Sequence, residues 1–180
     1  DISAVLRVLF NSGFFRSQDC WYTKVKSPVE LVAGVLRLTG EFDRPRREIL
    51  DRYSQASFMG QVLNDPPSVE GWHTGKEWID GGTLLRRINF IADHVGDVGY
   101  PGIQSIVEKL AAEGPTMSPE GLVDGCLRLL GHYEVTEQTH QELLEHARKS
   151  GDLATNTREF PQKVGKMLQL IVATKEYLYA

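Results

Sequence analysis

The residues with the greatest capacity for chemistry lie in an irregular stretch from Trp72 to Asp80, which reads WHTGKEWID. Its two tryptophans are large and rigid, and each indole carries one hydrogen-bond donor. A flat aromatic ring can stack on a sugar ring, a nucleobase or a proline, while neighbouring charged groups supply hydrogen bonds. The stretch predicts a site for a protein partner or a glycan, and its candidate ligand-binding residues are Trp72, His73, Lys76, Glu77, Trp78 and Asp80.

A second interpretation gives the same residues a structural role. Both tryptophans can fix the loop on neighbouring helices, with each indole N–H bonded to a backbone carbonyl. The surrounding glycines permit backbone turns and close approaches that other residues forbid; they are Gly71, Gly75, Gly81 and Gly82. Exposed tryptophans beside a cleft would favour ligand binding, whereas buried tryptophans would favour scaffolding.

These residues do not by themselves form a metal site or a catalytic site. His73 and Glu77 have the i, i+4 spacing of one helix face, but Gly75 interrupts it and no third ligand is evident. The chain has no Gly-x-Ser-x-Gly elbow, phosphate loop or GxGxxG motif, so we predict no cofactor and no reaction for this chain alone. The alternative is a hydrolase or other enzyme whose site another region completes, with His73, Glu77, Asp80 and Arg86 as contributors.

Other charged side chains also have two interpretations. An arginine-rich segment is either a solvated helix face or an anion site; it contains Arg44, Arg46, Arg47 and Arg52. Local ion pairs on a solvated face contribute only about 0.2–0.5 kcal/mol each. His94 and His132 lie near predicted helix ends, where a histidinium interacts favourably with the helix dipole, so a structural role suffices for both.

Two cysteines, Cys20 and Cys126, are too few for a disulfide framework or a zinc site. Cys126 lies on an apolar helix face and is expected in the core, as free cysteines usually are. Cys20 lies in a predicted loop beside Trp21. A bridge between the two requires Cα atoms within about 7 Å of each other, so their pairing stays open.

The composition is that of an ordinary globular protein. With 180 residues, 41% apolar and 24% charged, the chain can form one domain with a sizeable core and no disulfides or metals. A net charge of −4 argues against a general nucleic-acid binder, which is usually basic. No apolar run approaches the ~20 residues that span a bilayer, and no signal peptide is visible.

The apolar spacing is helical almost throughout the chain. It predicts helices at 2–10, 28–39, 45–59, 83–95, 103–111, 119–130, 136–149 and 158–178. The first of these is expected to bury one apolar face. Ser27-Pro28-Val29-Glu30 contains a capping box with proline at the first helical position, and Ser118-Pro119-Glu120 repeats this start. Thr83 is expected to cap its own helix.

We therefore predict an all-α fold of seven or eight helices in an irregular array, with a long Pro/Gly/Trp-rich connecting loop. Long irregular connections are expected at 14–26 and 61–82. A break rich in glycine and proline near residue 99 predicts a helical core at 1–98 and a C-terminal helical subdomain at 101–180 packed on it.

Three segments resemble the C-terminal region of a bacterial family, domain of unknown function 1800. They are KVKSPVELV at 24–32, the Met-Gly-Gln, Pro-Pro, Gly-Trp and Trp-Ile elements within 59–79, and TLLRRINF at 83–90. Their order and spacing agree with the family over roughly residues 1–95, and the resemblance is weak from residue 101 onward. The family usually has proline and glycines after Gly-Trp, where this chain has His73-Thr74-Gly75.

The resemblance implies a larger protein. Members are typically longer, with a large helical N-terminal part, and many are exported, which implies an exported or periplasmic location. The chain, which begins at Asp1, is accordingly expected to be a C-terminal piece that packs on its own N-terminal region. The family brings no reaction, cofactor or catalytic residue. The resulting hypothesis is a noncatalytic helical binding or assembly module from a larger bacterial protein, with its contact surface around Trp72 to Gly82.

Overall fold

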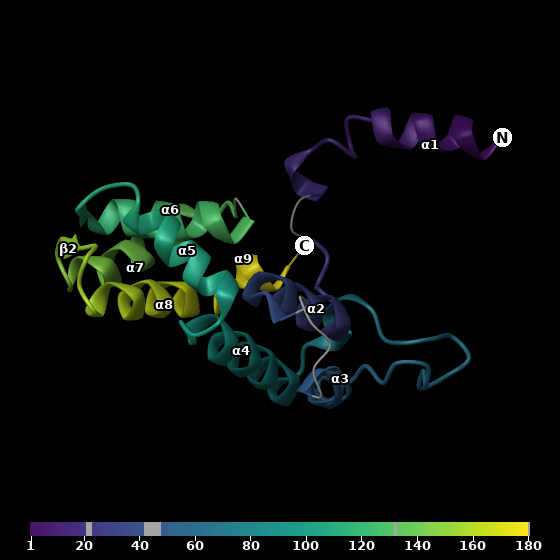
Figure 1. Cartoon of the computed structure of the whole chain (residues 1–180). Coiled ribbons are helices and arrows are strands. Elements are labelled where there is room, and N and C mark those ends of the chain that lie inside the picture. The colour runs from purple at the N-terminus through teal and green to yellow at the C-terminus, as the bar shows by residue number, and fades with distance from the viewer. Residues whose placement is uncertain (21–22, 42–47, 132, 180) are drawn as a thin grey trace.

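A computed structural model describes residues 1–20, 23–41, 48–131 and 133–179. Within these ranges the chain is helical with one two-stranded sheet, so the predicted all-α class is confirmed (Figure 1). The α-helices are α1 (Ile2–Asn11), α2 (Pro28–Thr39), α3 (Glu48–Phe58), α4 (Gly81–Gly96), α5 (Pro101–Ala111), α6 (Pro119–Gly131), α7 (Glu137–Arg148), α8 (Glu159–Val172) and α9 (Lys175–Leu178). Two short 3₁₀ helices, η1 (Gln18–Cys20) and η3 (Gly75–Trp78), lie in the connections.

The start of α2 follows the sequence pattern closely. The Ser27 hydroxyl accepts a hydrogen bond from the Glu30 backbone N–H at 3.3 Å, and the Glu30 carboxylate accepts one from the Ser27 N–H at 2.8 Å. These two bonds form the predicted capping box. Gly40 ends the helix in the left-handed conformation, with φ of 79°, which glycine adopts without steric cost.

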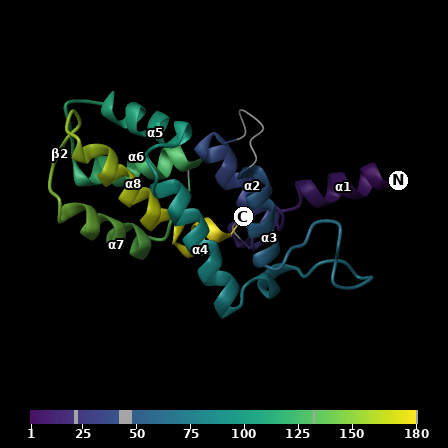
Figure 2. The same cartoon turned by 60° about the horizontal axis from the view of Figure 1, so that its bottom comes forward.

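The core is continuous from α2 to α9. α4 and α8 form the most extensive helix pair, and Figure 2 shows them crossing at the centre of the molecule. Ile91 and Val95 of α4 are fully buried, as are Val164 and Leu168 of α8. Since α4 lies in the predicted 1–98 core and α8 in the predicted 101–180 subdomain, the two parts share one apolar interior. Their division into two units stays a prediction.

Two details of the C-terminal part differ from the sequence-based expectation. The connection between the helices predicted at 136–149 and 158–178 contains a short strand, β2 (Leu153–Ala154), which pairs antiparallel with β1 (Thr116–Met117). The single helix predicted at 158–178 is wrong, because α8 ends at Val172 and a new cap begins α9. The Thr174 hydroxyl accepts from the Tyr177 N–H at 3.4 Å, and this turn redirects the chain.

The C-terminal end packs against the segment that precedes α2. The Lys26 N–H donates to the Leu178 carbonyl at 3.2 Å, next to a bridge between Val25 and Tyr179. The Lys26 ammonium donates to the Tyr177 carbonyl at 2.6 Å, and its own carbonyl accepts from the buried guanidinium of Arg87 at 2.8 Å. Burial lowers the pKa of Arg87. These bonds join the segment before α2 to α4 and α9.

Glu176 joins the start of α9 to the start of α7. Its Oε1 accepts from the Thr136 N–H at 3.1 Å and from the Thr139 hydroxyl at 2.9 Å. Burial by itself raises the pKa of the Glu176 carboxyl. The hydrogen bonds, of which the bond from the Thr136 N–H is the strongest contributor, outweigh burial and hold the pKa below its ordinary value.

A Glu176→Gln substitution should therefore have a pH-dependent cost. A lowered pKa means that the folded state favours the carboxylate. Its contribution is fully present above the ordinary carboxyl pKa of about 4.3 and is lost as the pH falls through the folded-state pKa. We expect the variant to unfold more easily near pH 7, by about 1 kcal/mol or less because solvent screens a partly exposed group. Urea unfolding of both proteins down to about pH 3 checks this, and a difference independent of pH would contradict it.

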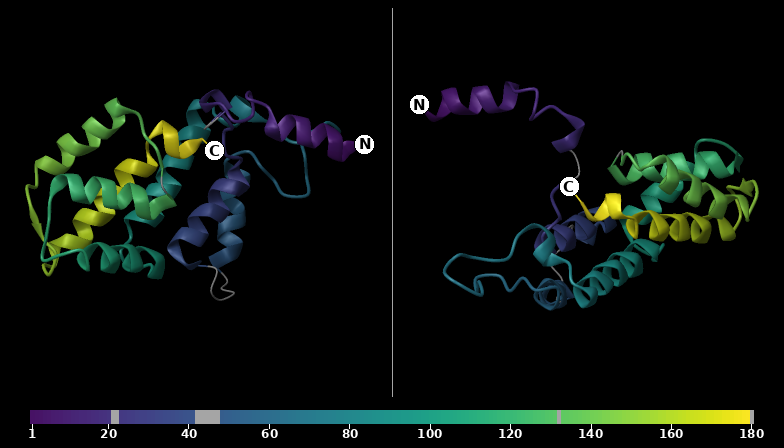
Figure 3. Two further views of the ribbon diagram at one scale, coloured as in Figure 1. Left: turned by 90° about the horizontal axis from the view of Figure 1, so that it is seen from above. Right: turned by 180° about the vertical axis from the view of Figure 1, so that it is seen from behind.

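The first helix forms, but its apolar face is not buried as the spacing predicted. α1 has no buried residue, and Ile2, Val5, Leu6, Leu9 and Phe10 are all exposed. Figure 3 shows α1 extending away from the body of the molecule in two further views. The periodicity identified the helix correctly, while the surface that would cover its apolar face is not supplied by the described part of this chain.

Candidate functional site

The two tryptophans of the predicted ligand loop differ in burial. Trp78 is 5% exposed, and its ring lies beside Gly60. Trp72 is half-buried, and its indole Nε1 donates to the Val62 carbonyl at 3.0 Å. Figure 1 shows the segment at 61–74 as a long loop that projects from the body. The contacts of both rings agree with scaffolding, and ligand binding by this loop stays a prediction.

The charged residues of the loop make short-range contacts. Glu77 accepts from the Thr74 N–H at 3.1 Å and thereby closes the start of η3. The His73 ring nitrogen Nδ1 lies 3.6 Å from the Glu77 carboxylate, so the predicted i, i+4 pair is close in space. Lys76 is exposed and lies within η3.

Asp80 begins α4 in place of the predicted Thr83. Its Oδ1 accepts from the backbone N–H groups of Gly82 and Thr83, both at 2.8 Å. Both bonds lower the pKa of the Asp80 carboxyl, and the bond from the Thr83 N–H lowers it more. The Thr83 hydroxyl accepts from the Asp80 N–H at 2.9 Å, so Thr83 is the reciprocal partner of the cap and not the cap itself. An enzyme site built from His73, Glu77, Asp80 and Arg86 stays an untested alternative.

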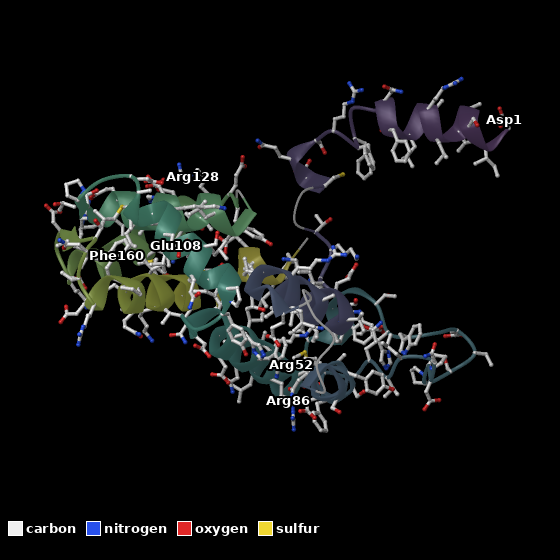
Figure 4. All side chains as sticks on the ribbon, viewed as in Figure 1. Asp1, Arg52, Arg86, Glu108, Arg128 and Phe160 are labelled. Atoms are coloured by element: carbon white, nitrogen blue, oxygen red, sulfur yellow. The ribbon has the colours of Figure 1, made fainter. Side chains whose placement is uncertain are left out.

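A second group of residues forms a pocket that was not predicted from the sequence. It lies between α3 and α4 and has a volume of about 390 Å³. We call it the polar pocket; its lining residues are Arg52, Gln55, Arg86, Asn89, Phe90, Asp93 and His94. Figure 4 labels Arg52 of α3 and Arg86 of α4, which both line this pocket.

A nearly buried ionic cluster supports one side of the polar pocket. The Glu41 Oε2 accepts from both Nε and Nη2 of Arg52 at 3.3 Å, and its Oε1 accepts from the Thr39 hydroxyl at 3.3 Å. The side chain of Glu41 is 10% exposed and that of Arg52 is 20% exposed. A carboxylate with a fixed guanidinium partner at low exposure holds the arginine in one orientation.

His94 connects this cluster to the pocket wall. Its Nδ1 lies 2.6 Å from the Phe90 carbonyl, which only accepts, so Nδ1 carries the proton. The buried Nε2 has no hydrogen-bond partner among the described residues and lies 3.7 Å from the Glu41 Oε1. Tyr100 stacks on the His94 ring at 5.8 Å, and burial, followed by the nearby Glu41, raises the pKa of the Tyr100 phenol.

Helical spacing was the signal that could have revealed the polar pocket. Arg52 and Gln55 are three residues apart on α3, and Arg86, Asn89 and Asp93 follow the i, i+3, i+7 pattern on α4. Among polar residues, the spacing was considered only for His73 and Glu77, and not for these helix faces. The sequence did single out Arg52 within a suspected anion site, while Arg44, Arg46, Arg47 and His132 lie outside the described residues.

The cavity along α7 and the two thiols are weaker candidates for a functional site. A cavity of about 610 Å³ lies along α7 and is lined mainly by exposed side chains, including Gln138, Glu142 and Glu145. Cys20 and Cys126 are both free thiols, and burial raises the pKa of Cys126 to about 12. Across the described ranges, no three His, Cys, Asp or Glu side chains cluster as metal ligands would. No helix in those ranges is long and apolar enough to cross a membrane.

Exposed apolar side chains form the third feature. Among the described residues, the large apolar side chains that are exposed fall in two segments only, residues 2–15 and residues 53–85. We call this surface the apolar face; it comprises Ile2, Val5, Leu6, Val8, Leu9, Phe10, Phe14, Phe15, Tyr53, Phe58, Val62, Leu63, Val69 and Leu85. It therefore belongs to α1 and the turn after it, α3, the projecting loop and the start of α4.

Comparison with known proteins gives one family and no function. The family model described as "Protein of unknown function (DUF1800)" matches residues 1–179. The match includes the C-terminal half, where the resemblance of the sequence was weak. No curated protein and no solved structure matches the chain.

Proposed function

The chain belongs to the DUF1800 family, and we propose that it is a noncatalytic helical binding or assembly module. Its contact surface is the apolar face, which covers another protein surface. The proposal rests on where the exposed large apolar side chains lie. In the described chain they fall only within residues 2–15 and 53–85, and none follows Leu85. Exposed large apolar side chains that gather in two segments are typical of interaction surfaces, whereas scattered single ones are ordinary.

α1 makes the strongest case for a covered surface. A ten-residue helix is marginally stable in water by itself, so its stability has to come from packing. Its apolar residues occupy most of the helix circumference, which is typical of a helix buried in a protein interior. The polar side is narrow and consists mainly of Ser3, Arg7 and Asn11.

The charge of α1 favours a protein surface as the occupant. Helices that lie on membranes usually carry many lysines and arginines on their polar face, whereas α1 carries only Arg7. A glycan supplies too little apolar area to cover the length of a helix. An apolar groove of about 180 Å³ between α2 and α3 adds recipient surface near the projecting loop, lined in part by Val32, Tyr53 and Leu63. The first candidate occupant is the N-terminal region of a longer polypeptide that carries this chain.

A Leu9→Asp substitution tests the role of α1. Burying a leucine contributes about 1.5–3 kcal/mol, so replacing it with a charged group should weaken docking of α1 at least about tenfold. In the longer polypeptide, we expect faster proteolytic cleavage in residues 12–20, because α1 is released. The readout is the rate of limited proteolysis under native conditions.

Ala4→Asp is the matched control, since Ala4 lies on the opposite side of α1 and is also exposed. It introduces the same charge into the same helix without removing an apolar contact. Equal cleavage rates for the Leu9→Asp and Ala4→Asp variants would contradict the proposal. Release of α1 only when a separate protein is removed would identify that protein as the occupant.

A further inference from the structure

We infer that the polar pocket is a binding site for a small organic anion that carries a carboxylate or phosphate group. This site is separate from the apolar face, and the inference does not depend on the proposed assembly function. Two arginines, one from each helix, line the same cavity, and Asp93 is the one acidic side chain among the described lining residues. Glu41 neutralises Arg52 from outside the lining, so an anion would be recognised by the hydrogen-bond donors of the two guanidinium groups and not by a net positive charge.

Arg52 is already held in position for such a ligand. Glu41 binds its Nε and Nη2 from the protein side, which fixes the plane of the guanidinium. A planar guanidinium with a fixed orientation recognises carboxylate and phosphate groups through paired hydrogen bonds. Preorganisation of this kind reduces the entropy lost when a ligand binds.

Arg86 provides the second cationic contact from α4. Its guanidinium carbon lies 5.4 Å from the centre of the Phe58 ring, a cation–π contact that positions an otherwise exposed side chain. Arg86 and Arg52 therefore approach the pocket from the two opposing helices. One anionic group between them would receive hydrogen bonds from both sides.

The other lining residues indicate which chemical groups the rest of the ligand would carry. Gln55 and Asn89 supply amide donors and acceptors, and Phe90 supplies a small apolar wall. Asp93 accepts hydrogen bonds only and therefore favours a hydroxyl or ammonium group on the ligand. With a volume of about 390 Å³, the pocket is at the lower end of ligand-sized cavities. These features fit a hydroxy acid, an amino acid or a phosphorylated analogue.

Isothermal titration of the 180-residue chain tests the inference. The probes are L-malate and O-phospho-L-serine, which distinguish a carboxylate from a phosphate, and succinate, which lacks the hydroxyl that Asp93 would bind. We expect saturable binding of at least one of the first two, and weaker binding of succinate than of malate. Sodium chloride at matched ionic strength corrects for nonspecific screening.

Variants locate the site. Arg86→Gln should weaken binding at least about tenfold, since it removes a charged hydrogen bond. Because Arg86 is exposed, this variant is expected to keep the fold, whereas Arg52→Gln would leave Glu41 unpaired. Asn89→Ala supplies a second, uncharged test.

Arg158→Gln is the matched control, because Arg158 is exposed at the start of α8 and lines no part of the pocket. Absence of saturable binding by every probe, or equal losses in Arg86→Gln and Arg158→Gln, would overturn the inference.

Discussion

Replacing Gly102 with alanine is expected to destabilise the protein by about 3 kcal/mol or more, as severe overpacking does. Gly102 lies in the first turn of α5, where the backbone of α5 crosses the end of α2. A Cβ atom at this position would lie 1.8 Å from the Leu38 carbonyl oxygen and 2.9 Å from the Thr39 carbonyl carbon. Both neighbours are backbone atoms, so the helices would have to separate.

Gly34→Ala is the control for this prediction. Gly34 lies within α2, and a Cβ atom there meets nothing within 4 Å. Alanine in an exposed helix interior is more stable than glycine by roughly 0.5–1 kcal/mol, so this variant should be more stable than the parent protein. Chemical denaturation of the two variants measures both effects. Similar free energies of unfolding for Gly102→Ala and the parent would show that α2 and α5 do not approach this closely.

Replacing Trp78 with alanine is the second change with a large expected effect. Removal of a buried tryptophan costs about 3–5 kcal/mol, because it leaves a cavity and loses apolar burial. Trp78 is 5% exposed, and its carbonyl also accepts from the Thr83 hydroxyl at 3.0 Å, next to the cap of α4. The variant should therefore lose stability in the region where the loop meets α4.

Trp72→Ala should cost much less, about 1–2 kcal/mol. It removes one hydrogen bond to Val62 and a ring that is only half-buried. Thermal and urea unfolding of both variants measure the difference. Equal losses would show that the two tryptophans brace the loop together. Because Trp72→Ala is expected to remain folded, it is also the variant with which ligand capture by the loop can be tested.

Local signals in the sequence predicted much of the fold. The capping box at Ser27 and the left-handed glycine at Gly40 define α2, and both are short-range features that need no tertiary context. Apolar spacing located α5, α6 and α7. It failed at Thr174, because an apolar pattern can continue across two helices while the backbone turns between them.

The site was harder to predict because it depends on how helices face each other. Arg52 and Arg86 are 34 positions apart in the sequence and become neighbours only when α3 packs against α4. Glu41 lies outside every predicted helix, although it holds Arg52 and approaches His94. Helical spacing predicts that His94 lies near a helix end, where a structural role suffices. It does not predict that His94 is buried or that Glu41 approaches it, because burial of an ionisable group depends on tertiary packing.

The exposure of α1 has a comparable cause. Periodicity shows that a helix has an apolar face, but it does not show which surface covers that face. The described part of the chain leaves Leu6 and Leu9 exposed, although their spacing predicts burial. In our account this mismatch is the mark of an assembly surface.

Hydrogen exchange of α1 tests this account most directly. Amide exchange in residues 2–15 should be measured by mass spectrometry in the isolated chain and in a longer polypeptide that carries it. We predict exchange close to the unprotected rate in the isolated chain, because α1 has no buried residue there, and strong protection in the longer polypeptide. Strong protection of α1 in the isolated monomer, or equal and rapid exchange in both proteins, would contradict the claim that the apolar face is covered by another protein surface.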